Sequence, residues 1–103
     1  MVQIQNNVLE YFDDLVYTLF EDEHFGFVEN SEDYVNRNVN FILENYKTFP
    51  SKQVPTQLQH FGTNYIFYKI NKRTTWYVFF ETNKDDFIVT YLINNHCKEA
   101  KYL

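Results

Sequence analysis

The densest group of chemically active side chains lies in the polar segment Asn94–Tyr102. Within it, His96 is the strongest candidate for proton transfer, because an imidazole titrates near neutral pH. Tyr102 can donate a proton or stack on a nucleic-acid base, and Lys98 and Lys101 can bind phosphate. The plainer alternatives are a surface histidine, a packed tyrosine and two solubilising lysines. The choice between these interpretations depends on what the fold brings next to the segment.

A second basic group lies earlier in the chain, on or beside a link between two expected strands. It contains Lys69, Lys72 and Arg73, which can hold a phosphate through charge-assisted hydrogen bonds. Bases on a hairpin also serve simply to keep a protein in solution. A site shared by these bases and His96 is therefore the hypothesis that the fold must test.

Neither a metal centre nor a thiol nucleophile is expected. His24, His60 and His96 are widely spaced and lack a cysteine or carboxylate at ligand spacing. Cys97 adjoins His96, but adjacent residues of an extended chain point to opposite sides and are badly placed to share a proton. The chain has 2 glycines and no glycine-rich phosphate loop. We therefore expect no metal and no cofactor.

Three short runs of aromatic and β-branched residues precede the polar segment and predict an antiparallel meander. They are Tyr65–Ile70, Thr75–Glu81 and Phe87–Ile93. In the middle run, alternation places aromatic residues on both faces: Trp76, Val78 and Phe80 on one, Tyr77 and Phe79 on the other. The sheet face without helices is therefore a candidate binding surface.

The first half of the chain predicts a short strand followed by two helices. Val2 and Ile4 alternate with glutamines, as in a half-buried strand. Apolar spacings of three and four predict a helix over 7–22, and a second over 31–49, ended by Pro50. The expected buried stripe of the second helix is Val35, Val39, Ile42, Tyr46 and Phe49. Residues 50–63 read as a loop, and 25–30 as the connection between the helices.

These elements occur in the order β-α-α-β-β-β, which predicts an α+β fold. One domain should span 1–103, with a helical hairpin packed on one face of a small, mainly antiparallel four-stranded sheet. The opening strand must pair within that sheet, because its backbone amides need partners.

Composition favours a small cytoplasmic protein. No run of about 18 apolar residues is present to span a membrane, and no basic region followed by an apolar stretch indicates a signal peptide. The single cysteine excludes an internal disulfide and fits a reducing compartment.

Charge divides unevenly between the halves of the chain. Residues 1–46 carry ten carboxylates and one arginine, a net charge of −9. Residues 47–103 carry eight bases and four acids, a net charge of +4. The basic half keeps a nucleic-acid partner open, because phosphate contacts need Lys and Arg. The acidic half reads as a solvated helical face.

The segments described above resemble the RelE/ParE toxin family of bacterial toxin–antitoxin systems across nearly the whole chain. Val2–Ile4 and the acidic helix start Leu9–Leu15 are similar to the family's first strand and helix. Phe61–Tyr68 is similar to the entry to its sheet, Trp76–Glu81 to its central strand, and Ile88–His96 to its last strand and following histidine.

The resemblance implies a toxin encoded beside a cognate antitoxin, which neutralises it by covering it with an extended or helical segment. RelE-like members cleave messenger RNA on the ribosome without a metal, whereas ParE-like members inhibit DNA gyrase. Both targets are open here. RNA cleavage at a 2′-hydroxyl needs a base, an acid and cations for the phosphate. The candidate catalytic residues are then His96, Arg73, Lys98 and Tyr102, and the candidate phosphate-binding residues are Lys69, Lys72 and Lys101.

An alternative from another class is a non-catalytic protein-binding module with the same fold. Many family members have arginine where this chain has Ile66 and Tyr77. The strongly basic surface usual in ribosome-directed members is also absent. Both differences favour a module that holds a protein partner on its aromatic sheet face. The oligomeric state does not follow from the sequence, which leaves a homodimer open.

Overall fold

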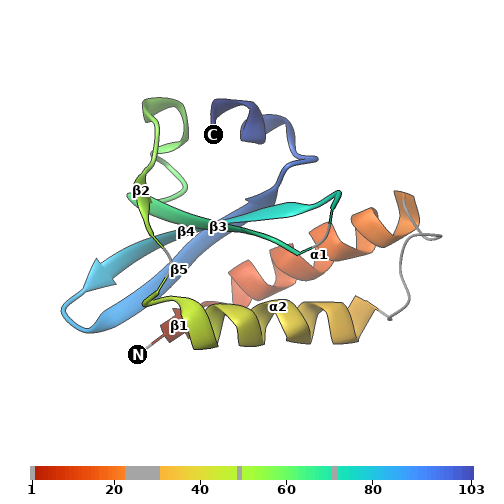
Figure 1. The fold of residues 1–103 in the computed structure, drawn as a ribbon, viewed down its shortest axis with the longest axis horizontal. Coiled ribbons are helices and arrows are strands. Elements are labelled where there is room, and N and C mark those ends of the chain that lie inside the picture. The colour runs from red at the N-terminus through yellow and green to blue at the C-terminus, as the bar shows by residue number, and fades with distance from the viewer. Residues whose placement is uncertain (1, 23–30, 49, 71) are drawn as a thin grey trace.

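The structure is a computed structural model that describes residues 2–22, 31–48, 50–70 and 72–103. Within these residues the chain forms two α-helices, five strands and short 3₁₀ segments (Figure 1). In chain order these are β1 (Val2–Ile4), α1 (Asn6–Asp22), α2 (Ser31–Asn45), β2 (Lys52–Gln53), η2 (Thr56–Leu58), β3 (Asn64–Lys69), β4 (Thr75–Asn83), β5 (Asp86–Asn94) and η3 (Lys98–Tyr102).

The strands form one sheet in the order β1-β5-β4-β3-β2. β1 runs parallel to β5, with Val2 opposite Phe87, and the other neighbouring pairs are antiparallel. Both helices cover the same face of the sheet and run in opposite directions (Figure 1). The predicted α+β class is confirmed, and so are the meander and the pairing of the opening strand.

The predicted count of four strands is wrong, because β2 adds a fifth at the edge. This strand lies within 50–63, the stretch expected to be a loop. Lys52 pairs with Tyr65 and Gln53 with Asn64, and the Val54 amide then donates to the Thr63 carbonyl at 3.0 Å. Both β2 residues are polar and exposed, so backbone pairing alone creates the strand and no apolar alternation marks it.

The helix α1 buries the face that its spacing predicts. Its start lies one residue earlier than expected: the Gln5 carbonyl accepts from the amides of Val8 and Leu9 at 3.0 and 3.1 Å, and the helix begins at Asn6. The fully covered side chains recur every three or four residues, at Val8, Phe12, Val16 and Leu19. This apolar stripe packs on the sheet and supplies one side of the main core.

The helix α2 differs from its prediction in both its end and its buried side. It ends at Asn45, and residues 46–48 form a turn. The side turned to the sheet is Tyr34, Asn38 and Ile42, whereas Val35 and Val39 are only partly buried. Phe49, also expected in the stripe, lies outside the described residues. The buried side was predicted wrongly because its central residue is Asn38, and an apolar pattern does not count asparagine as buried.

A buried polar network explains why an asparagine occupies that position. The Tyr68 hydroxyl donates to Asn38 Oδ1 at 2.6 Å, and Asn38 Nδ2 donates to the Tyr34 carbonyl at 2.9 Å. Next to them, Trp76 Nε1 donates to the Tyr34 hydroxyl at 2.9 Å. Burial raises the pKa of Tyr68 well above its usual value, so the phenol remains a donor. The network joins α2 to β3 and β4 with its buried polar groups paired.

The opposite face of the sheet carries a second apolar cluster. Its buried members are Val54, Leu58, Tyr65, Phe79 and Ile93. The segments η2 and η3 lie over this face, on the side of the sheet away from the helices (Figure 1). A register shift between β4 and β5 leaves Thr90 as an extra residue, and its hydroxyl donates to the Phe61 carbonyl at 2.6 Å beside η2. Much of the face expected to be an open binding surface is therefore covered by the chain itself.

None of the described helices combines the length and the hydrophobicity required to cross a membrane.

We expect Asn38→Leu to destabilise the protein although leucine is the more apolar residue. The Tyr68 hydroxyl would lose its acceptor inside the core, which costs about 1–3 kcal/mol of the free energy of unfolding. Urea unfolding measures the change. Asn40→Leu, on the exposed side of the same helix, should change stability by less than about 0.5 kcal/mol. Equal stability of Asn38→Leu and the wild type would show that the network contributes nothing.

Candidate functional site

The segment that follows β5 is held against the turn between β3 and β4. The Asn95 amide donates to the Thr75 carbonyl at 3.0 Å, and the Thr75 amide donates to Asn95 Oδ1 at 2.9 Å. Asn95 Nδ2 then donates to the Arg73 carbonyl at 3.0 Å. One asparagine thus joins two segments that lie far apart in sequence, and it fixes the backbone of the turn that carries Lys72 and Arg73.

His96 takes its position from the same junction. Its amide donates to Asn94 Oδ1 at 2.9 Å, and its Nε2 lies 3.3 Å from Oγ1 of the buried Thr74. The imidazole remains exposed to solvent. A hydrogen bond to Thr74 orients the ring, and the tautomer decides which partner donates. His96 is therefore accessible for proton transfer beside the turn that carries Arg73.

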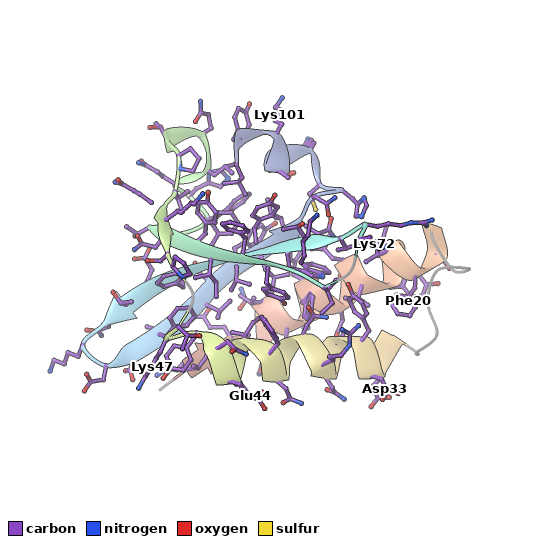
Figure 2. All side chains as sticks on the ribbon, viewed as in Figure 1. Phe20, Asp33, Glu44, Lys47, Lys72 and Lys101 are labelled. Carbon is purple, nitrogen blue, oxygen red and sulfur yellow. The ribbon has the colours of Figure 1, made fainter. Side chains whose placement is uncertain are left out.

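The seven residues predicted for the site fall into three places. Lys72, Arg73 and His96 belong to the junction at one end of the sheet. Lys69 lies at the end of β3, and Lys98, Lys101 and Tyr102 belong to η3. Figure 2 shows Lys72 at the end of the hairpin and Lys101 in the layer above the sheet, clearly apart. The fold brings His96 to the turn that carries Lys72 and Arg73, through Thr74, and leaves the η3 residues on a neighbouring surface.

Tyr102 is not a packed residue, since 43% of it is exposed. The Lys101 Nζ lies 5.1 Å from the centre of its ring, a cation–π arrangement at the surface. Leu103, one residue later, packs into the second cluster instead. Both η3 side chains are thus available to a ligand on the face opposite the helices.

A further surface on this face was only partly anticipated. We call it the aromatic groove: about 390 Å³ of space on β2, β3 and β4, lined in particular by Lys52, Tyr65, Phe67, Lys69 and Tyr77. The ring of Phe67 is 6.1 Å from that of Tyr77 and 6.4 Å from that of Tyr65. Phe67 is 41% exposed, and the Lys52 Nζ lies 5.1 Å from its ring centre.

The aromatic groove combines ring faces with cations. Exposed rings stack on unpaired bases, and lysines beside them follow the phosphate backbone. Burial, with a smaller electrostatic contribution from Tyr77, raises the pKa of Tyr65, so its phenol stays neutral at physiological pH. The groove therefore has the elements of a surface for single-stranded nucleic acid, and an apolar peptide segment would fit the same chemistry.

Cys97 has the environment of an unreactive thiol. Burial raises its pKa, and the neighbouring Glu99 adds to the rise, whereas a hydrogen bond with Asn94 opposes it. Its Sγ lies 3.6 Å from Asn94 Oδ1. The thiol is therefore protonated at neutral pH and is a poor nucleophile. Among the described residues, no group of His, Cys, Asp or Glu side chains is arranged to hold a metal ion.

Sequence reasoning missed Lys52, Asn95 and Thr74 as site residues. Lys52 lines the groove only because the short strand β2 pairs with β3, and no sequence pattern predicted that strand. Asn95 acts through its backbone partners, so the sequence showed only that it lies two residues after a predicted strand. Phe67 had a signal, because it alternates with buried residues and pairs with Tyr77 across the meander.

Comparisons with models of known protein families, with characterised protein sequences and with solved structures find no match. The function proposed below therefore rests on the residues and geometry of this chain.

We expect Asn95→Ala to loosen the turn between β3 and β4. The Thr75 amide would lose its acceptor, so its hydrogen exchange should accelerate about two- to tenfold. Exchange measured by NMR at Thr75 tests this. Asn95→Asp keeps an acceptor for Thr75 but removes the donor to Arg73, so it should leave the exchange of Thr75 nearly unchanged. Unaltered exchange in Asn95→Ala would mean that the junction does not depend on this side chain.

Proposed function

We propose that this chain is a cytoplasmic toxin of the RelE/ParE type, neutralised by a cognate antitoxin. Of the two modes of action that the resemblance implies, cleavage of ribosome-bound messenger RNA has the better support. The observation that carries the proposal is the junction, where Asn95 binds the Arg73–Thr75 backbone and His96 lies exposed beside this turn.

The side chains of the junction and of the neighbouring η3 surface include the groups that metal-independent RNA cleavage needs. In that reaction the 2′-oxygen attacks the adjacent phosphorus, the bond to the 5′-oxygen breaks, and a cyclic phosphate forms. A base removes the 2′ proton, and an acid protonates the leaving oxygen. His96 suits either proton transfer, and Tyr102 can be the second group. In this proposal Arg73 at the junction, together with Lys98 from the neighbouring η3 surface, offsets the charge that develops on the phosphate.

The aromatic groove supports the same proposal from the binding side. Phe67 and Tyr77 offer stacking surfaces for bases beside the cleaved phosphate, and Lys52 and Lys69 offer cations for the flanking backbone. In this arrangement the groove binds the strand, and the junction performs the chemistry. Lys72 and Lys101 extend the basic surface on either side.

One observation favours a second candidate, a non-catalytic module that binds a protein partner. The proton-transfer and phosphate-binding candidates are spread over three places, and Lys72 and Lys101 lie well apart (Figure 2). A binding surface tolerates that spread better than a catalytic site does. Gyrase inhibition, which requires no RNA chemistry, belongs to this binding-only class of action.

Induced expression in a bacterial host, with wild type beside His96→Ala, tests the proposal. We expect growth to stop with an early failure of translation, and His96→Ala to abolish the arrest, because the proton-transfer group is gone. His60→Ala removes another exposed histidine, one that packs on Phe61 beside η2, and should remain toxic. Growth and the incorporation of labelled amino acids and nucleotides are followed after induction.

The other outcomes separate the alternatives. A failure of replication that His96→Ala retains would replace RNA cleavage by gyrase inhibition. Normal growth with all three proteins, each present in folded form, would overturn the toxin proposal and favour the binding module.

Phe67→Ala should weaken the binding of single-stranded RNA on the order of tenfold, because one stacking surface is lost. The side chain is exposed, so the fold should persist. Fluorescence anisotropy with a labelled RNA oligomer at low salt measures the affinity. Tyr17→Ala removes an exposed ring from α1, on the far side of the sheet, and should leave the affinity unchanged. Equal affinities of Phe67→Ala and wild type would exclude the aromatic groove as the RNA surface.

A further inference from the structure

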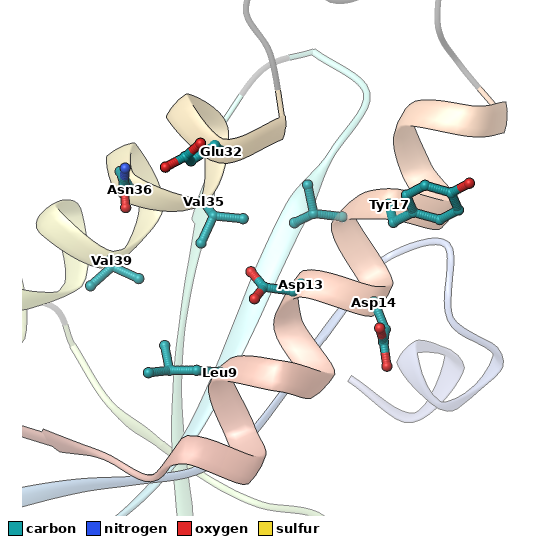
Figure 3. Close-up of a pocket in the computed structure, with 9 residues that line it drawn as sticks. Leu9, Asp13, Asp14, Tyr17, Glu32, Val35, Asn36 and Val39 are labelled. Carbon is teal, nitrogen blue, oxygen red and sulfur yellow. The ribbon is translucent and has the colours of Figure 1, made fainter.

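A second groove lies between α1 and α2 and opens away from the sheet, whose strands pass behind it in Figure 3. It encloses about 670 Å³. Its lining extends along α1 from Leu9 to Tyr17, which corresponds to about 12 Å along the helix axis at about 1.5 Å per residue. The groove is thus long enough for two to three turns of a docked helix, and it is separated from the aromatic groove by the sheet.

The floor of this groove is aliphatic. Leu9 and Val16 contribute from α1, and Val35 and Val39 from α2. Val16 is fully buried, whereas the other three are partly exposed. The placement of Val35 and Val39 follows from α2 turning Tyr34, Asn38 and Ile42 to the sheet. Two valines expected to be fully buried therefore pack against the edge of the core and leave part of their surface in the groove.

The rim of the groove is acidic. Asp13, Asp14 and Glu32 line it and are exposed, and Figure 3 shows Asp13 projecting into the space between the helices. Tyr17, 63% exposed, stands at one end. The described residues that line the groove include these three carboxylates and no Lys or Arg, so the potential at the rim is negative. We call this surface the acidic groove.

Charge selects one class of occupant. Nucleic acid is excluded, since its phosphates would meet carboxylates. A second copy docked groove to groove would place the same acidic rims against each other, at a cost in like-charge repulsion. A helix with one apolar side and flanking Lys or Arg residues matches both the floor and the rim.

We propose that the acidic groove binds a basic amphipathic helix of a partner protein. Apolar side chains spaced at i, i+4 and i+7 cover the aliphatic floor, and cations on either side of them meet Asp13, Asp14 and Glu32. Because the sheet separates this groove from His96, the partner can bind without entering the proposed RNA site. The inference does not depend on the proposed function, and failure of either leaves the other unaffected.

A synthetic, fluorescein-labelled helical peptide tests the proposal on the full chain. It carries leucines at the spacing above and Lys or Arg at the flanking positions. A second peptide has the same composition with its leucines distributed around the helix. We expect the first to bind at least fivefold more tightly, because only it presents a continuous apolar side. Anisotropy is measured at low salt and at about 0.5 M salt, where the affinity should fall as the ion pairs are screened.

Matched variants locate the binding. Asp13→Asn/Glu32→Gln removes two rim charges and should weaken the first peptide at least fivefold. Glu10→Gln/Glu44→Gln removes the same charge from exposed positions of α1 and α2 outside the groove, and should change the affinity by less than twofold. Val35→Ala shortens a floor residue without changing charge and should weaken binding two- to fivefold.

Three results would overturn the proposal. Equal losses in the two charge variants would indicate attraction by the acidic half as a whole. Equal binding of the two peptides would indicate that the apolar floor makes no contribution. A dimer in sedimentation that Asp13→Asn/Glu32→Gln strengthens would identify a second copy, held away by its own charges, as the occupant.

Discussion

Trp76 is the side chain on which the arrangement of layers depends. It lies in β4, the central strand, and is completely buried. The ring of Phe12 in α1 meets it edge to face at 4.9 Å, and the Tyr34 hydroxyl in α2 accepts its indole N–H. One residue thus sets the distance of both helices from the sheet. The Tyr68 hydroxyl in β3 donates to Asn38 of α2, so the orientation of this helix is held at a second point. Val35 and Val39 then lie at the margin of the core, where they are only partly buried.

The second apolar cluster positions the segments that cover the sheet face opposite the helices. It holds η2 and η3 against the sheet and so determines which aromatic residues remain accessible. Phe79 is covered completely, whereas Phe67, on the neighbouring strand, is left partly in solvent. The exposed rings therefore lie toward the β2 edge, where Lys52 joins them. The same layer places Lys98 and Tyr102 beside this face. On each side of the sheet, the segments that cover part of the face determine which side chains stay exposed on the remainder.

Much of the fold was predictable because its signals are local. The stripe of α1 follows a helical period, and the meander follows from aromatic runs with short polar links. The position of His96 beside the turn that carries Arg73 could also be predicted, since the third strand of a meander ends next to the link between the first two strands. The tertiary hydrogen bonds of Asn38 were not, because an apolar pattern treats asparagine as exposed. The strand β2 and the position of η3 depend on pairing and packing partners remote in sequence, and no local pattern encodes them.

The short strands at the two edges of the sheet have a consequence for behaviour at high concentration. β1 has three residues and β2 has two, and β2 exposes a lysine. Where β1 ends, α1 continues along β5, with Tyr11 stacked on Tyr91 at 4.6 Å. Long flat edges recruit strands from other molecules, whereas short, charged or helix-covered edges give them little to pair with. A chain with 20% aromatic residues is thereby protected against edge-to-edge aggregation. Its contacts with other molecules then form through side chains and not through strand pairing.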